Sequence, residues 1–160
     1  MTAARAVSCG SCTLCCTVMK VTMPDRVKPA HQTCEHCTAR GCGVYADRPE
    51  TCSTFQCLWL ASQQDERLAL PRALRPDQCG VMIDLNCAGT ILAHCEFPAS
   101  WKAEPARSWL LGMARRGHNV MLDSRDGTKL LTADGSTCAL RCIGVDPQTN
   151  NRVYVREDAI

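Results

Sequence analysis

The chain has 160 residues, 14 of them cysteine, a net charge of +2 and only 4% aromatic residues. The balanced charge argues against a nucleic-acid-binding surface, and no apolar run is long enough to form a membrane-spanning helix, so we expect neither partner. The apolar fraction of 46% includes the cysteines, so the hydrophobic core is thin and bound metal would add to its stability.

Cysteines are concentrated in residues 1–60, where a C-x2-C-x2-C-C run precedes a C-x2-C-x4-C run. Spacings this short bring several sulfurs to one ion or cluster. We therefore predict nine metal ligands: Cys9, Cys12, Cys15, Cys16, Cys34, Cys37, Cys42, Cys52 and Cys57. The metal is zinc or iron, and mononuclear sites, a polynuclear cluster and an iron-sulfur cluster all remain open.

Disulfide bonds are the competing interpretation of so many cysteines. Met1 to Ser8 contain no apolar stretch of signal-peptide length, so we expect a cytoplasmic protein with reduced thiols. Adjacent Cys15 and Cys16 are also awkward for any scheme of disulfide pairs. Metal binding is therefore the favoured interpretation.

The stretch Asp47-Arg48-Pro49-Glu50 has the form of a capping box and predicts a short helix from Arg48 that carries Cys52 inward. We expect Tyr45, Phe55 and Trp59 to shield the metal from water. Arg48 and Lys20 are candidates to offset thiolate charge. His36, within C-E-H-C, is expected to lie beside the ligands rather than among them.

The runs CGSCTLCC and GCGVYADRPETCSTFQC together resemble the CxxCxxCC cysteine-cluster family, a zinc- or iron-chelating domain of the YkgJ type. The resemblance covers residues 9–59, and Cys34 and Cys37 are a variant of an upstream cysteine in that family. The matching positions are Cys9, Cys12, Cys15, Cys16, Cys42, Tyr45, Arg48, Pro49, Cys52, Phe55 and Cys57.

This resemblance implies metal binding without an established reaction. One branch with a related cluster resembles flagellin lysine methylases, in which the cysteines serve an iron-sulfur centre. The present chain has neither the C-x3-C-x2-C run of radical adenosylmethionine chemistry nor a G-x-G-x-x-G loop. An iron-sulfur redox or protein-modifying enzyme is therefore the alternative function.

Residues 61–77, with Pro71 and Pro76, are expected to form a connection. Beyond them, alternating apolar residues predict hairpins at 79–97, 120–131 and 138–155, with turns at Asn86 to Gly89, at Asp126-Gly127 and at DPQTNN. A helix is predicted at 104–116 because apolar residues recur at helical spacing: Ala106, Trp109, Leu110, Met113 and Ala114.

The remaining cysteines are expected to have packing roles. Cys79, Cys95, Cys138 and Cys142 fit the core as small apolar residues, and Cys87 is left undecided. His94 and Cys95 are adjacent on a predicted strand, so Cys95 should face the core and His94 the solvent. They therefore do not form a catalytic pair.

Together these patterns predict an α+β fold. A cysteine-cluster module at 1–60 is followed by a connection at 61–77 and a small α+β region at 78–160 that packs on the module, all within one domain or two. We expect a cytoplasmic metal-binding protein with a structural, regulatory or metal-handling role and no catalytic activity of its own. Its expected partner is a metal ion, and a protein partner remains open.

Overall fold

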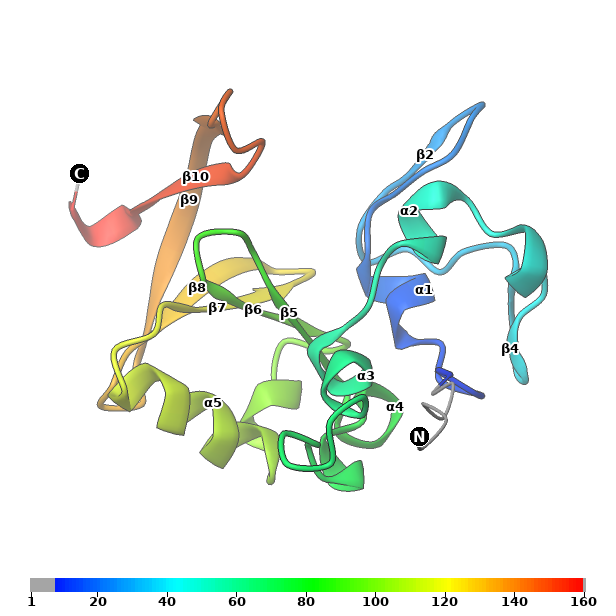
Figure 1. Ribbon diagram of the computed structural model, residues 1–160. Coiled ribbons are helices and arrows are strands. Elements are labelled where there is room, and N and C mark those ends of the chain that lie inside the picture. Colours follow the sequence, from blue (N-terminus) through cyan, green and yellow to red (C-terminus); the bar gives the residue numbers. More distant parts are fainter. Residues whose placement is uncertain (1–7, 160) are drawn as a thin grey trace.

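A six-stranded sheet is the largest element of the computed structural model, which describes residues 8–159 and has an α+β fold (Figure 1). Neighbouring strands are antiparallel except for the parallel pair β6 and β7. In spatial order the strands are β10 (Arg152–Arg156), β9 (Thr137–Val145), β8 (Gly127–Leu131), β7 (Val120–Ser124), β6 (Ile91–Cys95) and β5 (Val81–Leu85).

The first predicted hairpin is confirmed, since Val81 pairs with Cys95 and Leu85 pairs with Ile91. Asn86 forms the turn between β5 and β6, where its Oδ1 accepts hydrogen bonds from the backbone N–H groups of Ala88 and Thr90 at 3.0 and 2.9 Å. This is the Asx-type bonding that favours asparagine in turns.

Strand β5 is buried on both faces, which strict alternation did not predict. Val81 and Ile83 face the main core, while Met82 on the opposite face is only 1% exposed. Met82 packs with Leu14 and Val18 of the N-terminal part. The cysteine-rich segment therefore covers one face of the sheet.

The predicted helix is confirmed as α5 (Ala106–Arg115), which joins the parallel strands β6 and β7. Ala106, Leu110 and Ala114 are buried as expected, and they pack against the sheet in the main core. Trp109 and Met113 lie at the edge of that core and are only partly buried. Figure 1 shows α5 below the strands.

The two later hairpins, β7–β8 and β9–β10, are also confirmed, with residue 127 beginning β8. Cys95 is fully buried as predicted. The core prediction is wrong for Cys142, which is exposed, and for Cys138, which is half-buried with its thiol 3.4 Å from Asp158 Oδ1. Strand β9 extends beyond the region that α5 covers, so its outer positions have no core to face.

Two further predictions for residues 78–160 need correction. Cys79 packs at the core margin, as a small apolar residue should, but it ends helix α4 rather than beginning a strand. His94 faces the side of the sheet opposite to that of Cys95, as predicted. It does not face the solvent, since its side chain is only 19% exposed and contacts Asp123 on the neighbouring strand.

Short elements make up the N-terminal part and the connection. They are α1 (Leu14–Val18), β1 (Val21–Thr22), β2 (Val27–Lys28), β3 (Cys37–Thr38), β4 (Gly41–Cys42), η1 (Tyr45–Asp47), α2 (Glu50–Ser53), α3 (Leu58–Ser62), η2 (Arg72–Leu74) and α4 (Pro76–Cys79). Two more 3-10 turns in the tail are η3 (Ser100–Lys102) and η4 (Glu157–Ala159).

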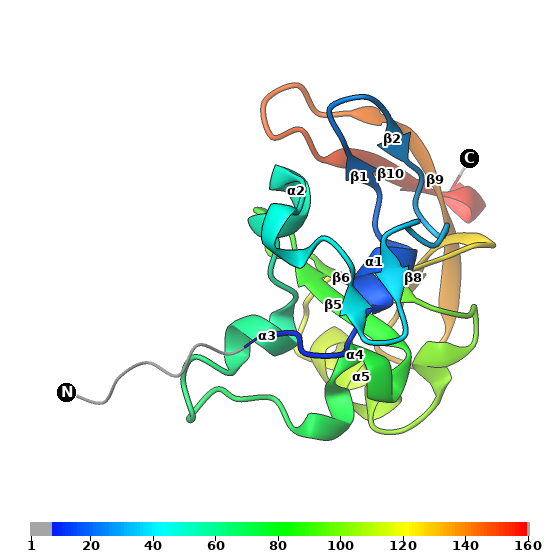
Figure 2. The same cartoon turned by 90° about the vertical axis from the view of Figure 1, so that its right-hand side faces the viewer.

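The hairpins β1–β2 and β9–β10 point toward the same end of the molecule, at the top of both ribbon views (Figures 1 and 2). Helices α1 and α3 of the cysteine-rich part contact β5. A second buried cluster, formed by Leu14, Val18, Cys57, Leu60 and Met82, joins this part to the sheet.

Within residues 8–159, no helix has both the length and the apolar character needed to cross a bilayer. The expectation that the chain has no signal peptide rests on Met1 to Ser8, of which residues 1–7 lie outside the described part of the chain.

Candidate functional site

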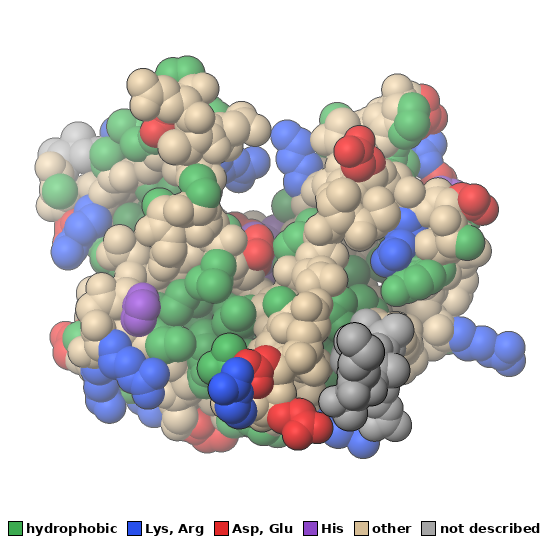
Figure 3. All heavy atoms as spheres, in the orientation of Figure 1, with side chains coloured by type: hydrophobic (Ala, Val, Ile, Leu, Met, Phe, Trp, Pro, Cys, Tyr) green, Lys and Arg blue, Asp and Glu red, His purple; other side chains and the backbone are tan. Residues whose placement is uncertain are grey.

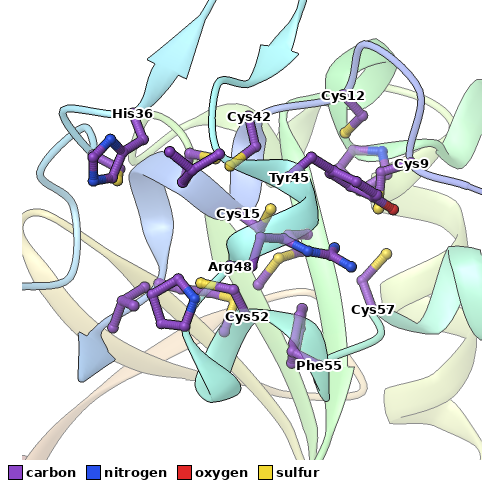
Figure 4. A pocket seen from close by; sticks show the side chains of 18 of the residues that line it. Cys9, Cys12, Cys15, His36, Cys42, Tyr45, Arg48, Cys52, Phe55 and Cys57 are labelled. Atoms are coloured by element: carbon purple, nitrogen blue, oxygen red, sulfur yellow. The ribbon is translucent and has the colours of Figure 1, made fainter. Parts of the chain in front are cut away.

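Eight of the nine predicted ligand cysteines line one cavity of about 90 Å³ (Figure 4). They come from α1, the loops around it, β4, α2 and the start of α3. In chain order they are Cys9, Cys12, Cys15, Cys16, Cys34, Cys42, Cys52 and Cys57. Cys37 does not line the cavity, but it pairs with Cys42 across β3 and β4. The fold thus gathers residues that are up to 48 positions apart in sequence, from Cys9 to Cys57.

Helix α1 positions the first group of thiols. Leu14 and Val18, one helical turn apart, are buried against the sheet, and this contact fixes the orientation of the helix. Cys15 and Cys16, between them, line the cavity. Just before α1, the N–H of Cys12 donates to the carbonyl of Cys9 at 3.1 Å, which closes a tight turn.

Gly41 allows the β3–β4 hairpin to approach this turn. Its φ of +127° lies in a region that favours glycine, and a Cβ atom there would be 3.2 Å from the carbonyl oxygen of Gly10. Cys42 follows directly. A glycine is therefore required where the second cysteine run meets the first.

The pKa shifts divide the thiols into two overlapping groups, which are joined where the charge of Cys16 raises the pKa of Cys9. We term the first set, Cys16, Cys34, Cys37, Cys42 and Cys52, the Cys16 group. Burial raises the pKa of Cys52, and the thiols of Cys16, Cys34 and Cys42 raise it further. The pKa of Cys37 is likewise raised by burial and by Cys16. A hydrogen bond to Cys15 is the largest cause of a raised pKa at Cys16.

The second set, which we term the Cys9 group, comprises Cys9, Cys12 and Cys57. Burial raises the pKa of Cys57, and the charges of Cys9 and Cys12 add to the rise. Burial and Cys12 have the same effect on Cys9. Like charges held close together disfavour ionisation, so a cation must replace the protons before these thiols can all ionise.

Among residues 8–159, no three side chains of His, Cys, Asp or Glu are arranged as a group that could hold a metal ion. All 14 cysteines are free thiols. The thiols share a cavity without converging on one point. The donor set itself is soft and anionic when ionised, which suits zinc and iron.

Arg48 lies in this cavity, with its guanidinium carbon 3.7 Å from the centre of the Tyr45 ring. Burial raises the pKa of Cys9 and of Cys52, and the charge of Arg48 partly offsets both rises. The Nε atom of Arg48 is buried and has no hydrogen-bond partner within the described residues. Arg48 therefore lies beside the thiols, as the sequence predicts. Lys20, the other predicted cation, is exposed and does not line this cavity.

Lys28 is a buried cation that the sequence did not single out. The residue is only 8% exposed. Its Nζ donates to the carbonyls of Thr17, Pro29 and Gln32 at 3.3, 3.0 and 2.6 Å. Burial lowers its pKa, while the nearby thiols of Cys34 and Cys16 favour its charged form. No spacing pattern marks Lys28, because only the folded loop places it beside the thiols.

Arg75 is a second missed cation and comes from the connection at 61–77. Its Nη2 donates to the carbonyl of Cys9 at 2.7 Å, and its guanidinium carbon lies 5.6 Å from the centre of the Trp59 ring. It also lowers the pKa of Cys9, although burial has the larger and opposite effect. The connection therefore takes part in holding the first cysteine turn.

The expected apolar wall is confirmed only in part. Tyr45 and Phe55 line the cavity, although Tyr45 is 44% exposed. Trp59 instead packs between the two buried clusters and donates from Nε1 to the carbonyl of Pro71 at 3.2 Å. His36 lines the cavity, with its Nε2 3.4 Å from Glu35 Oε1.

The predicted capping box is wrong. Helix α2 begins at Glu50, its N-cap residue is Pro49, and no side chain caps it. Arg48 is extended, with ψ of 145°, because the ring of a following proline disfavours the helical conformation. Asp47 belongs to the preceding 3-10 turn. Cys52 nevertheless reaches the cavity from α2.

Comparison of the chain with models of protein families, with curated proteins and with solved structures gave no match.

Proposed function

We propose that this chain is a metal-binding protein that holds zinc or iron through the thiolates of its nine N-terminal cysteines, as a member of the CxxCxxCC type. The observation that carries the proposal is the shared cavity, in which eight of those cysteines meet from five segments of chain. Packing alone needs only an occasional cysteine, so eight thiols around one cavity support a role as soft ligands.

The two groups of thiols support two centres. The Cys16 group would hold one centre, with Lys28 beside it, and the Cys9 group would hold the other, with Arg75 beside it. Arg48 lies between them, since its charge partly offsets the raised pKa of Cys9 and that of Cys52. These cations offset the excess negative charge that several thiolates bring to a metal. Fully thiolate-ligated zinc has no open position for a substrate, which favours a structural or metal-handling role.

Metal analysis combined with a visible absorption spectrum tests the proposal on protein purified without oxygen. We expect bound zinc in a colourless protein, or iron with a visible absorption band, in either case released together with structure on chelation. Protein that is free of zinc and iron, yet fully folded, would refute the proposal. A band that shifts on addition of adenosylmethionine would instead support the iron-sulfur enzyme.

A further inference from the structure

A carboxylate on strand β7 connects the N-terminal part to the sheet. Asp123 Oδ2 lies 2.9 Å from Nε2 of His31 and 3.1 Å from Nδ1 of His94, while Oδ1 accepts from the hydroxyl of Thr128 at 3.2 Å. Burial raises the pKa of Asp123, but the hydrogen bonds from both histidines outweigh this and lower it overall. Asp123 is therefore a carboxylate with three donors.

These contacts fix the tautomer of His94. Because an ionised carboxylate can only accept, His94 must donate from Nδ1, which leaves the lone pair of Nε2 free in the neutral ring. Within residues 8–159, Nε2 of His94 has no hydrogen-bond partner and is not among the buried unpaired atoms. Nδ1 of His31, in contrast, is buried. His94 thus offers an oriented, accessible acceptor.

His94 lines a second cavity, of about 240 Å³, between the β1–β2 side of the molecule and the β9–β10 hairpin. At about 30 Å³ for each water molecule, this space suits a small metabolite. Polar and charged side chains line part of it, among them Lys20, His94, Asp123, Asn151, Arg152 and Tyr154, and apolar Val18, Ala30, Leu92 and Met121 line the rest. Figure 3 shows the notch between the two hairpins, bordered by basic side chains on both sides.

The charge of this cavity is positive. Lys20 and Arg152 line it, and the neighbouring Tyr154 raises the pKa of the Arg152 guanidinium. Asp123 is its single lining carboxylate, and two ring N–H groups already occupy that carboxylate. Asp84, on the same face of the sheet, does not line the cavity.

A metal ion is a poorer fit than an organic ligand. Both histidines bind the same oxygen of Asp123, so an ion on that oxygen would displace both hydrogen bonds. Within the described residues, no three candidate ligands form a group that could hold an ion. The cavity also places the cations Lys20 and Arg152 at its rim, and these would repel a metal ion.

We propose that this second cavity binds a small organic anion that also carries a hydroxyl or amino group. Arg152 and Lys20 bind its carboxylate or phosphate, and Nε2 of His94 accepts a hydrogen bond from its hydroxyl or amino donor. The asparagine side chains supply further donors and acceptors. None of the lining residues is a cysteine, so the ligand and the proposed metal occupy separate cavities, although Val18, Lys20 and Ala30 belong to the segment that the metal is expected to hold.

Titration of the full chain with three probes tests this site, with binding followed by calorimetry and by the NMR signals of the histidine rings. L-lactate carries the carboxylate and the hydroxyl, propionate lacks the hydroxyl, and glycerol 3-phosphate replaces the carboxylate by a phosphate. We expect L-lactate or glycerol 3-phosphate to shift the His94 signals, and the tighter of the two identifies the anionic group. Propionate should bind more weakly than L-lactate.

Two pairs of variants locate the binding. Arg152→Gln should weaken the tighter probe at least about tenfold, about 1.4 kcal/mol, while Arg141→Gln, at an exposed position outside the cavity, should not. His94→Phe removes the free acceptor together with the donor to Asp123, so it should abolish the preference for L-lactate over propionate. His118→Phe, at an exposed position, is its control.

The proposal is overturned if neither L-lactate nor glycerol 3-phosphate shifts the His94 signals at millimolar concentration. Equal weakening by Arg152→Gln and Arg141→Gln would also overturn it, because this indicates general charge attraction. An unchanged preference for the hydroxyl in His94→Phe would show that His94 does not bind it.

Discussion

At the scale of single residues, the environment of each cysteine separates the predicted ligands from the rest. Cys95 is fully buried, and burial raises the pKa of its thiol to about 12, as expected for a packing residue. Cys12 instead lines the shared cavity, and its charge adds to the raised pKa of Cys9 and of Cys57. A residue's neighbours, not its type, therefore indicate its role.

We predict that Cys12→Ser loses bound metal, because the change removes a soft anionic ligand. Cys138→Ser, at the margin of β9, should keep its metal and cost at most about 1–3 kcal/mol of folding free energy. Metal content and denaturant unfolding measure the two effects. Equal loss of metal in both variants would show that the tail also provides ligands.

Lys28 and Lys20 make a matched pair of cations. Lys28→Met leaves three carbonyls without their donor and removes a charge beside the thiols, so we expect weaker metal retention and a loss of about 1–3 kcal/mol. Lys20→Met, at an exposed position, should change neither quantity. Competition with a metal chelator and thermal unfolding provide the measurements. If Lys20→Met has the greater effect on metal retention, the sequence-based prediction is right and the structural assignment is wrong.

At the scale of elements, short turns hold the cysteines where long helices could not. Cys42, Cys52 and Cys57 reach the cavity from a two-residue strand, a four-residue helix and the N-cap of α3. Elements of this length bury little apolar surface and are marginal on their own. Contacts such as that between Gly41 and Gly10 therefore decide their arrangement.

Gly41→Ala tests that arrangement, and Gly127→Ala is its matched control. Both glycines have positive φ, of +127° and +112°, so both variants should lose stability from backbone strain, by roughly 1 kcal/mol. At Gly41 the new Cβ also meets a backbone oxygen at 3.2 Å, while at Gly127 nothing lies within 4 Å. We expect metal loss only in Gly41→Ala, measured as metal content after dialysis. Retention of metal in both variants would contradict the proposed approach of the two cysteine runs.

At the scale of the whole molecule, the cysteine-rich part and the sheet share a buried cluster. Leu14, Val18 and Leu60 cover Met82, on the face of β5 opposite α5. The sheet has its own core around Leu110, Val120 and Ile91, which includes none of the nine N-terminal cysteines. Loss of metal should therefore affect the two parts unequally.

Chelation is expected to abolish amide exchange protection in residues 9–57 and to weaken it in β5, since metal binding and folding are coupled where the apolar core is thin. Strands β7 and β8 and helix α5 should remain protected. Hydrogen exchange with and without bound metal measures this directly. Unchanged protection in residues 9–57 after complete metal removal would show that the fold there does not depend on metal.

The sequence by itself determined the α+β class, helix α5 and the hairpins, because these depend on local spacing and on turn residues such as Asn86 and Asp126. It also singled out the cysteines that share the cavity. It misplaced the start of α2, where the restriction that Pro49 places on Arg48 prevails over the capping pattern. Only the tertiary structure placed Lys28 and Arg75 beside the thiols and joined His31 to His94 through Asp123. Those contacts link distant segments, and their geometry depends on how α1 packs against β5, which no local pattern contains.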